Sequence, residues 1–210
     1  MHRGTLMAGL RAAQKAMTRK LLLGKALELF TQQSYARTTI DEIASAAGTT
    51  RVTFYAHFPS KADLMRALID ELNELLDRTA SPTHGSTASA LVTVVTEGTP
   101  EGIRAWLRET AGRWDIIRPY TNAAFESAVT DPALRTLMDE WFEEPIGDIA
   151  DGLDAAGRFS PETRRLRGVL AMAQLDHAAR HWRPGVWDAS LDVVLAVLTE
   201  SWTALLTDKA

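Results

Sequence analysis

Residues 39–64, TIDEIASAAGTTRVTFYAHFPSKADL, decide the fold of this chain. Thr39 can cap a helix, and Glu42 follows three residues later, which is the spacing of a capping box. Gly48 ends that helix, because glycine takes the left-handed backbone conformation without steric cost. Thr50 can then cap a second helix. Two short helices joined by such a tight turn are typical of a helix-turn-helix.

The second of these helices is predicted to have an inward and an outward face. Phe54 and Phe58 lie four residues apart, so both can face a core. The remaining positions carry hydroxyl, guanidinium, imidazole and small apolar groups: Arg51, Val52, Thr53, Tyr55, Ala56 and His57. This mixture suits base edges and phosphates better than it suits a protein core. The pattern therefore predicts a helix that enters a DNA groove.

The same stretch resembles the DNA-binding domain of TetR-family transcriptional repressors, over about residues 19–68. The positions that match the family pattern are Thr39, Ile43, Ala44, Ala47, Gly48, Thr53, Tyr55, His57, Phe58, Lys61 and Leu64, with Ala26, Leu27, Phe30 and Tyr35 upstream. Two departures stand out. Ser34 occupies the place where a glycine usually ends the first helix, and Val52 replaces the usual glycine of the recognition helix.

The resemblance implies a set of DNA-binding residues: Thr39, Thr50, Arg51, Val52, Thr53, Tyr55, His57 and Lys61. Thr39, Tyr55, His57 and Lys61 are expected to hold phosphates, whereas residues 51–53 are expected to face base edges. Arg51 can pair bidentately with a guanine, and Val52 can touch a thymine methyl group.

Charge is unevenly distributed along the chain. Residues 1–61 have a net charge of +6 and residues 62–210 a net charge of −10, which together give the −4 of the whole chain. A basic head on an acidic body fits a nucleic-acid binder, although chance clustering explains it equally well on its own. The first 17 residues are either a basic arm that reaches phosphates or a minor groove, or a weakly ordered tail or helix extension.

Composition excludes several functional classes. The sequence has no cysteine, and therefore no disulfide framework, thiolate metal site or cysteine nucleophile. No apolar run approaches the ~18 residues that span a membrane, so we expect no membrane partner and a cytoplasmic location, bacterial by the resemblance. The common nucleotide-binding and nucleophile motifs are absent. We therefore expect no enzymatic activity, catalytic residue, cofactor or metal.

The rest of the chain is predicted to be helical, which makes the fold all-α. A capping residue precedes proline at three helix starts, Thr99, Asp131 and Ser160. Further helices are expected at 60–78, 87–97, 100–117, 120–128, 132–156, 161–182 and 188–207, with a polar connection at 81–89. The expected domains are an N-terminal basic arm (1–17), a three-helix helix-turn-helix DNA-binding domain (18–66) and a C-terminal helical effector-binding and dimerisation domain (67–210).

The last two expected helices are apolar on more than one face. A helix that is apolar all round must be buried on both sides, either by its own chain or by a partner subunit. TetR-like proteins pair their final two helices in a four-helix bundle, so the resemblance implies a homodimer. Such a dimer presents two recognition helices to the half-sites of a palindromic operator in double-stranded DNA.

In the C-terminal part of the chain, aromatic residues concentrate between the connection at 81–89 and residue 145. A cavity lined by them suits an apolar or aromatic small-molecule effector, although aromatic residues at helical spacing also simply fill cores. The candidate polar anchors are Asp115, Arg118, Gln174, Asp176 and His177. The residues expected to bind the ligand are Trp106, Trp114, Phe125, Met138, Trp141, Phe142, Met172 and Asp176. The presence of an effector pocket is implied by the resemblance.

Two other groups invite a functional interpretation. His177 and His181 have a spacing that can bind a metal, but the H-E-x-x-H pattern is absent, so a histidine pair without metal is favoured. The acidic run across 139–151, including Asp148, is expected to be a solvated helix face. The sequence thus predicts a ligand-responsive repressor. The alternatives are a ligand-binding or interaction module with decayed DNA function, supported only by Val52, and a small helical metal-dependent enzyme.

Overall fold

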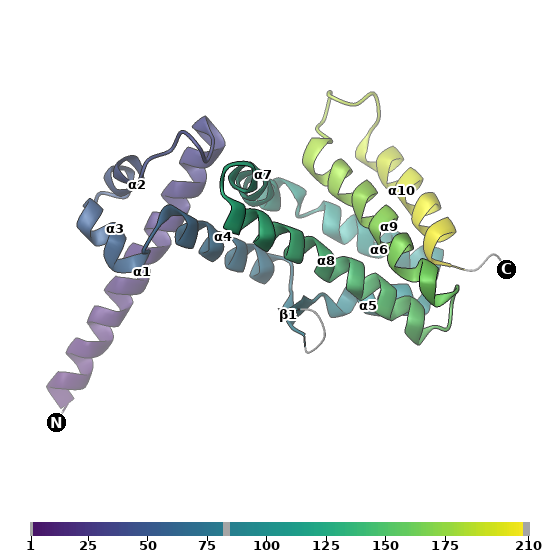
Figure 1. Cartoon of the computed structure of the whole chain (residues 1–210), viewed down its shortest axis with the longest axis horizontal. Coiled ribbons are helices and arrows are strands. Elements are labelled where there is room, and N and C mark those ends of the chain that lie inside the picture. The colour runs from purple at the N-terminus through teal and green to yellow at the C-terminus, as the bar shows by residue number, and fades with distance from the viewer. Residues whose placement is uncertain (1, 82–84, 208–210) are drawn as a thin grey trace. The chain divides into compact units, whose positions relative to one another are not determined.

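The computed structural model of the chain describes residues 2–81 and 85–207, with side chains described from residue 9 onward (Figure 1). The helices are α1 (His2–Gln33), α2 (Ile40–Ala46), α3 (Arg51–His57), α4 (Lys61–Leu75), α5 (Ser89–Glu97), α6 (Pro100–Ala111), α7 (Trp114–Thr130), α8 (Pro132–Ala155), α9 (Pro161–His181) and α10 (Leu191–Leu206). Strands β1 (Thr79–Ala80) and β2 (Ser86–Thr87) form a two-residue antiparallel pair. The predicted all-α class is confirmed.

The chain divides into two compact units, one made of Met1–Glu71 with Pro119–Thr136 and the other of Leu72–Arg118 with Leu137–Ala210. In the first unit, the Tyr35 amide donates to the Glu126 carboxylate at 3.2 Å, which ties α7 to the loop after α1. The functional domain limits expected from the sequence stay a prediction. Residues 2–17 continue α1 as a helix. Whether this segment acts as a basic arm stays a prediction.

The core of the first unit is built by the inward faces of its helices. The buried side chains are Leu22, Leu23, Ala26, Phe30, Ile43, Ala44, Phe54, Phe58, Leu64, Met65 and Leu68. The Phe54 and Phe58 rings lie 5.8 Å apart, which confirms the predicted inward face of α3. These contacts fix α3 by its back, leaving its other face at the surface.

Local capping sets the ends of α2 and α3. The Thr39 amide donates to Glu42 Oε2 at 2.7 Å and the Glu42 amide to Thr39 Oγ1 at 3.2 Å, so the predicted capping box is confirmed. Gly48 follows α2 with a φ of +64°. The Thr50 hydroxyl accepts from the Thr53 amide at 3.2 Å and starts α3. Each predicted boundary of the helix-turn-helix is therefore present.

Ser34 ends α1 in a backbone conformation that usually requires glycine. Its φ is +81°, in the left-handed region that disfavours residues with a Cβ. Its amide donates to the Phe30 carbonyl, and its own carbonyl accepts from the Thr38 amide and hydroxyl. The surrounding hydrogen bonds therefore hold a strained residue at this turn.

The second unit differs from the expected helices at one point. The helix expected at 100–117 ends at Ala111, and α7 begins at Trp114 and continues through Pro119 to Thr130. Proline lacks the amide hydrogen of a regular helix, which is why the sequence suggested a break at that residue. Helices α6 and α9 both pack on α10. Part of the expected connection at 81–89 lies outside the described residues.

A carboxylate of α8 organises the start of α5. Asp148 is fully buried, so the expectation of a solvated acidic face is wrong at this position. Its oxygens accept from the Thr87 hydroxyl at 2.6 Å and the Ala88 amide at 2.8 Å. Asp148 therefore fixes the residue that precedes α5 from another helix, although no side chain caps the first turn of α5. Within the described residues, no helix combines the length and apolar character of a membrane span.

Candidate nucleic-acid interface

The outward face of α3 is highly exposed. Val52 is 80% exposed and Tyr55 43%, whereas Phe54 between them is fully buried. Because the Val52 side chain packs against little of its own chain, it is available to contact another surface. Helix α3 therefore presents residues 51–53 and 55 to a partner while its phenylalanines hold it in place.

Arg51 is already engaged at this surface. Its Nη1 forms an ion pair with Asp41 Oδ2 at 2.8 Å, and its Nη2 donates to the Tyr55 hydroxyl at 3.3 Å. The hydrogen bond to Tyr55 and the charge of Asp41 raise the pKa of Arg51, so the group stays cationic. These exposed contacts orient the guanidinium without burying it.

The threonine hydroxyls predicted to bind DNA act as helix caps. Thr39 and Thr50 each accept a backbone amide, and the Thr50 and Thr53 hydroxyls lie 3.0 Å apart. A hydroxyl has two acceptor sites and one donor, so capping still leaves hydrogen-bonding capacity at each. The structure thus places Thr39, Thr50 and Thr53 at the N-terminal ends of α2 and α3, with Thr39 and Thr50 as the caps.

His57 lies at the other end of α3, beside α1. Its imidazole is half-buried, and burial together with the charges of Lys15 and Arg19 lowers its pKa. The Arg19 guanidinium lies 4.4 Å from the centre of the neighbouring Phe58 ring. The structure therefore brings a basic part of α1, which the sequence did not connect with α3, next to a predicted phosphate-binding residue.

Lys61 has a structural role that the sequence did not reveal. Its Nζ donates to the carbonyls of Tyr35 and Thr38, both at 2.8 Å, and lies 4.3 Å from the centre of the Tyr35 ring. Partial burial lowers the pKa of Lys61, and burial also raises the pKa of Tyr35 to about 12. Two of the three ammonium hydrogens thus hold the loop after α1, which leaves one for a phosphate.

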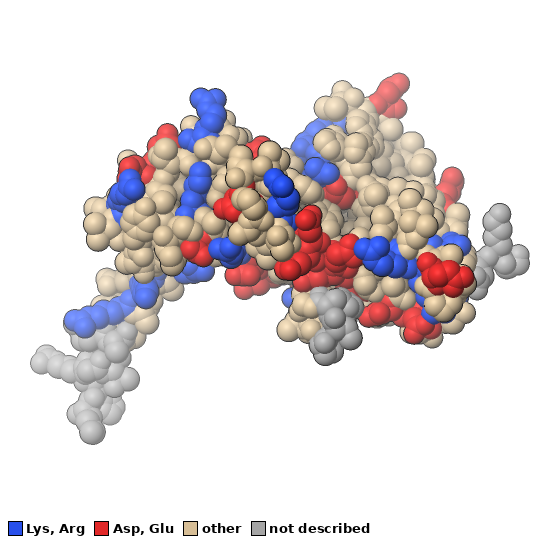
Figure 2. All heavy atoms as spheres, viewed as in Figure 1, with Lys and Arg blue, Asp and Glu red and all other residues tan. Residues whose placement is uncertain are grey.

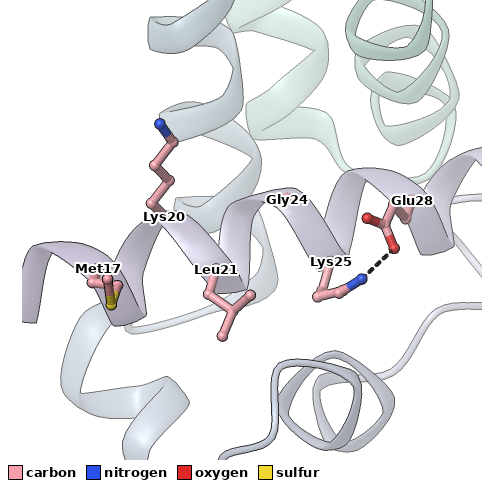
Figure 3. A pocket seen from close by; sticks show the side chains of 6 residues that line it. All are labelled: Met17, Lys20, Leu21, Gly24, Lys25 and Glu28. Carbon is pink, nitrogen blue, oxygen red and sulfur yellow. Dashed lines mark hydrogen bonds and ion pairs between the residues drawn. The ribbon is translucent and has the colours of Figure 1, made fainter. Parts of the chain in front are cut away.

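Basic side chains follow α1 where it extends from the helix-turn-helix (Figure 2). On a different face of this helix lies an open groove of about 350 Å³. The residues that line it, labelled in Figure 3, are Met17, Lys20, Leu21, Gly24, Lys25 and Glu28. Lys25 and Glu28 form an ion pair at 2.8 Å within it. All six lining residues belong to α1, so the groove is a feature of one helix surface and contains none of the predicted site residues.

The predicted effector-binding aromatic residues make core contacts in the second unit. Trp106 stacks on Trp202 with 5.4 Å between ring centres, and Trp114 is tilted against Trp182 at 6.3 Å. The indole Nε1 atoms of Trp114 and Trp202 and the Gln174 Oε1 are buried without a hydrogen-bond partner among the described residues. Buried polar atoms without partners are rare and usually mark an unseen water or ligand.

A second aromatic group lies on α8. Trp141 meets Phe142 edge-to-face at 5.1 Å and donates from Nε1 to Asn73 Oδ1 at 2.7 Å, while Arg78 lies 5.1 Å above the Trp141 ring. Met138, three positions before Trp141, is also buried. The Trp141 indole is therefore hydrogen-bonded, unlike those of Trp114 and Trp202.

The remaining residues that the sequence predicts to bind the ligand are Phe125, Met172 and Asp176. Met172 is half-buried on α9, and Asp176 forms a two-oxygen ion pair with Arg180. Phe125 belongs to the other compact unit. The role of the eight predicted residues in ligand binding stays a prediction.

The two histidines of α9 lie against each other and beside an aromatic ring. The His177 and His181 ring centres lie 4.6 Å apart, and Trp187 stacks on His177 at 5.9 Å. Among the side chains that the structure describes, no group of three or more histidine, aspartate or glutamate residues is placed to hold a metal ion.

Comparison with known proteins gives the family of the chain. The family model for bacterial regulatory proteins of the tetR family matches residues 22–68. The HTH-type transcriptional regulator TtgR of Pseudomonas putida is 43% identical over 63 residues, which make up 30% of this chain and 30% of TtgR. The match therefore spans less than a third of the length of this curated relative.

Solved structures extend the likeness of the fold to most of the chain. The SmeT–triclosan complex aligns with a TM-score of 0.66 and 17% identity over 88% of this chain and 91% of SmeT. NalD of Pseudomonas aeruginosa, the secondary repressor of the MexAB-OprM multidrug efflux pump, aligns with a TM-score of 0.65 and 17% identity over 90% of this chain and 97% of NalD. These relatives are regulators rather than enzymes. Residues 22–68 therefore match the tetR family of bacterial regulatory proteins, and most of the chain shares the fold of the solved structures of SmeT and NalD.

Proposed function

We propose that the chain is a cytoplasmic DNA-binding transcriptional regulator, and specifically a repressor that leaves a palindromic operator when a small-molecule effector binds. The observation that carries the proposal is the surface of α3, where an exposed valine, a cationic guanidinium and a phenol surround a buried phenylalanine. Direct readout of a major groove needs this combination of a rigid helix, a bidentate donor and an apolar contact. The alternative of a decayed DNA-binding surface gains no support, because the residues at this surface keep their polar groups exposed.

A selection from random duplexes tests DNA binding with the full chain. We expect enrichment of an inverted repeat whose half-sites lie about one helical turn, or a multiple of it, apart. Failure to enrich any sequence, with protein that melts cooperatively, would favour the alternative interaction module. The relatives TtgR and NalD support DNA binding by this chain, but they do not indicate which operator sequence it binds.

The homodimer is proposed through α9 and α10. Large apolar side chains remain exposed on these two helices: Leu166, Leu170, Val193 and Val197. On each helix the two residues lie four positions apart, so each pair forms a stripe on one face. Two exposed stripes on neighbouring helices are the surface that a second copy would cover in a four-helix bundle.

Sedimentation analysis tests the dimer. The double variant Leu170→Glu/Val197→Glu is expected to be a folded monomer, because a carboxylate in an apolar interface is costly to desolvate. A double variant at exposed sites elsewhere, Ile116→Glu/Val129→Glu, is the matched control and should remain dimeric. A monomeric wild-type chain at micromolar concentration contradicts the proposal.

The effector is proposed to be an apolar or aromatic small molecule that binds in the second unit. The unpaired indoles of Trp114 and Trp202 and the amide oxygen of Gln174 favour an aromatic ligand that carries a few polar atoms, because an apolar molecule without them cannot satisfy these groups. The SmeT structure, with triclosan bound, shows that a protein of this fold holds an aromatic compound. A thermal-shift screen of apolar aromatic compounds, followed by release of the selected duplex, tests both binding and response.

Release requires that the effector bind the free form more tightly than the DNA-bound form. A compound that raises the melting temperature but leaves the DNA affinity unchanged would be a ligand without regulatory effect. A compound that raises the melting temperature and also lowers the DNA affinity would establish the proposed response.

A further inference from the structure

One face of α1 changes from apolar to basic along the helix. Leu22, Ala26 and Phe30 recur at helical spacing on this face and are buried in the core of the first unit. Continuing the same spacing toward the N-terminus gives three basic residues: Arg19, Lys15 and Arg11. The face that packs on the helix-turn-helix is therefore the one that becomes cationic.

The basic row begins at the edge of the candidate DNA interface. Arg19 lies over the Phe58 ring at the end of α3, and the charges of Lys15 and Arg19 act on His57. Farther along, Lys15 and Arg11 are exposed. Figure 1 shows the N-terminal half of α1 continuing past α3, and Figure 2 shows basic side chains along it.

These cations have no counter-charge within the described part of the chain. None of the three forms an ion pair with a described carboxylate, and the sequence contains no acidic residue before Glu28. Like charges four residues apart on a helix repel one another, so the row costs stability in the free protein. A row of this kind fits an anionic surface that covers it from outside.

The dimensions suit duplex DNA. Arg11 and Arg19 lie eight positions apart, and at a rise of ~1.5 Å per residue the row is about 12 Å long. Duplex DNA carries one negative charge per ~1.7 Å of its axis, so several phosphates lie within that length. Because the row starts beside His57, DNA that contacts α3 would continue along it.

We propose that Arg11, Lys15 and Arg19 on the N-terminal half of α1 bind the phosphate backbone of duplex DNA flanking the half-site read by α3. The contact lies outside residues 22–68, the segment that matches the family model. It rests on the proposed DNA-binding function and adds length to the bound site without adding base preference, because phosphates carry no sequence information.

The experiment compares two duplexes and two charge-matched variants of the full chain. One duplex ends at the selected inverted repeat, and the other extends about one helical turn beyond it on each side. Arg11→Gln/Lys15→Gln removes two charges from the proposed row, whereas Lys20→Gln/Lys25→Gln removes two charges from other faces of α1. Arg19 is left in place because it packs on Phe58. Circular dichroism and melting confirm that both variants fold.

We expect wild-type protein to bind the extended duplex more tightly than the short one. On the extended duplex, Arg11→Gln/Lys15→Gln should lose this gain and show a salt dependence that is shallower by about 1.8, at ~0.9 per lost phosphate contact. The Lys20→Gln/Lys25→Gln control should behave as wild type. An unchanged slope in the first variant, or an equal loss in the control, overturns the proposal while leaving DNA binding by α3 intact. A wild-type chain that selects no duplex overturns the proposed function and this contact together.

Discussion

The Arg51 guanidinium is paired with the Asp41 carboxylate, with 2.8 Å between Nη1 and Oδ2. The only basic side chain at the start of the recognition helix is therefore held by an acidic residue of the preceding helix. DNA must compete with Asp41 for Arg51, and the carboxylate also repels nearby phosphates. Asp41→Asn is accordingly expected to tighten binding to the selected duplex, and to tighten binding to random duplexes by a smaller amount, measured by fluorescence titration.

The double variant Asp41→Asn/Arg51→Ala separates the two effects. If Asp41 acts by restraining Arg51, most of the gain should vanish when Arg51 is absent. Arg51→Ala alone is expected to weaken binding to the selected duplex about 5- to 100-fold and to relax base preference at one position. An equal loss on selected and random duplexes would contradict the base-reading role of Arg51.

Lys61→Ala is expected to lower both stability and DNA affinity. Loss of the two hydrogen bonds to the Tyr35 and Thr38 carbonyls should reduce the free energy of unfolding by about 1–2 kcal/mol, because both acceptors lose a charged donor. Loss of one phosphate contact should make the salt slope shallower by about 0.9. A lower melting temperature with an unchanged slope would mean that Lys61 is structural and does not touch DNA.

Local patterns were sufficient to predict the helix-turn-helix, whereas long-range partners were not. The capping box of Thr39 and the Phe54–Phe58 pair depend on residues three or four positions apart, so the sequence displays them directly. Lys61 reaches carbonyls more than 20 positions away, and nothing in the local sequence shows that its ammonium is engaged.

The same limit explains the error at Asp148. Helical spacing placed it on an acidic and therefore solvated face, yet it is buried and accepts from the Ala88 amide, about 60 positions away. The expected effector residues show the limit again, because the partner rings Trp182 and Trp202 come from segments far along the chain from Trp114 and Trp106.

DNA affinity is expected to rise as the pH falls from about 7.5 to 6. In the free protein, burial and the charges of Lys15 and Arg19 hold the pKa of His57 below its ordinary value of ~6.5. A phosphate near the ring favours the protonated form, so binding takes up a proton and is strengthened by acid. Titrations at constant ionic strength should show this trend in wild type and lose it in His57→Gln.

The stability of the free protein should have the opposite dependence on pH. Because the folded-state pKa of His57 is lowered, the unfolded chain binds this proton more readily, and the contribution of His57 to stability falls as pH drops through ~6.5. If His57→Gln retains the pH dependence of DNA binding, another group takes up the proton.

Ser34→Gly is expected to stabilise the protein. The φ of +81° is strained for serine and free of strain for glycine, while glycine raises the entropy of the unfolded chain. The net gain should be about 0.5–1 kcal/mol, since the left-handed conformation costs roughly 1–2 kcal/mol for a residue with a Cβ. Ser34→Ala keeps the Cβ and should bring no gain in a denaturant titration. An equal effect of glycine and alanine would show that the serine hydroxyl, not the backbone, sets the stability at this turn.

Val52 is expected to recognise a thymine through its methyl group. It is 80% exposed in the free protein, so Val52→Ala should leave stability within about 0.5 kcal/mol of wild type. Replacing the thymines of the selected duplex one at a time by uracil removes a single methyl group from the major groove. At one position this should weaken wild-type binding about three- to fivefold, the amount for one buried methyl group.

The double-mutant cycle makes the contact testable. At the thymine that Val52 touches, Val52→Ala should bind the thymine and uracil duplexes equally, because the interaction is already lost on the protein side. A uracil effect of the same size in wild type and variant would place the methyl group against another residue. A uracil effect at no position would mean that Val52 reads no thymine, and that base preference lies with its neighbours Arg51 and Thr53.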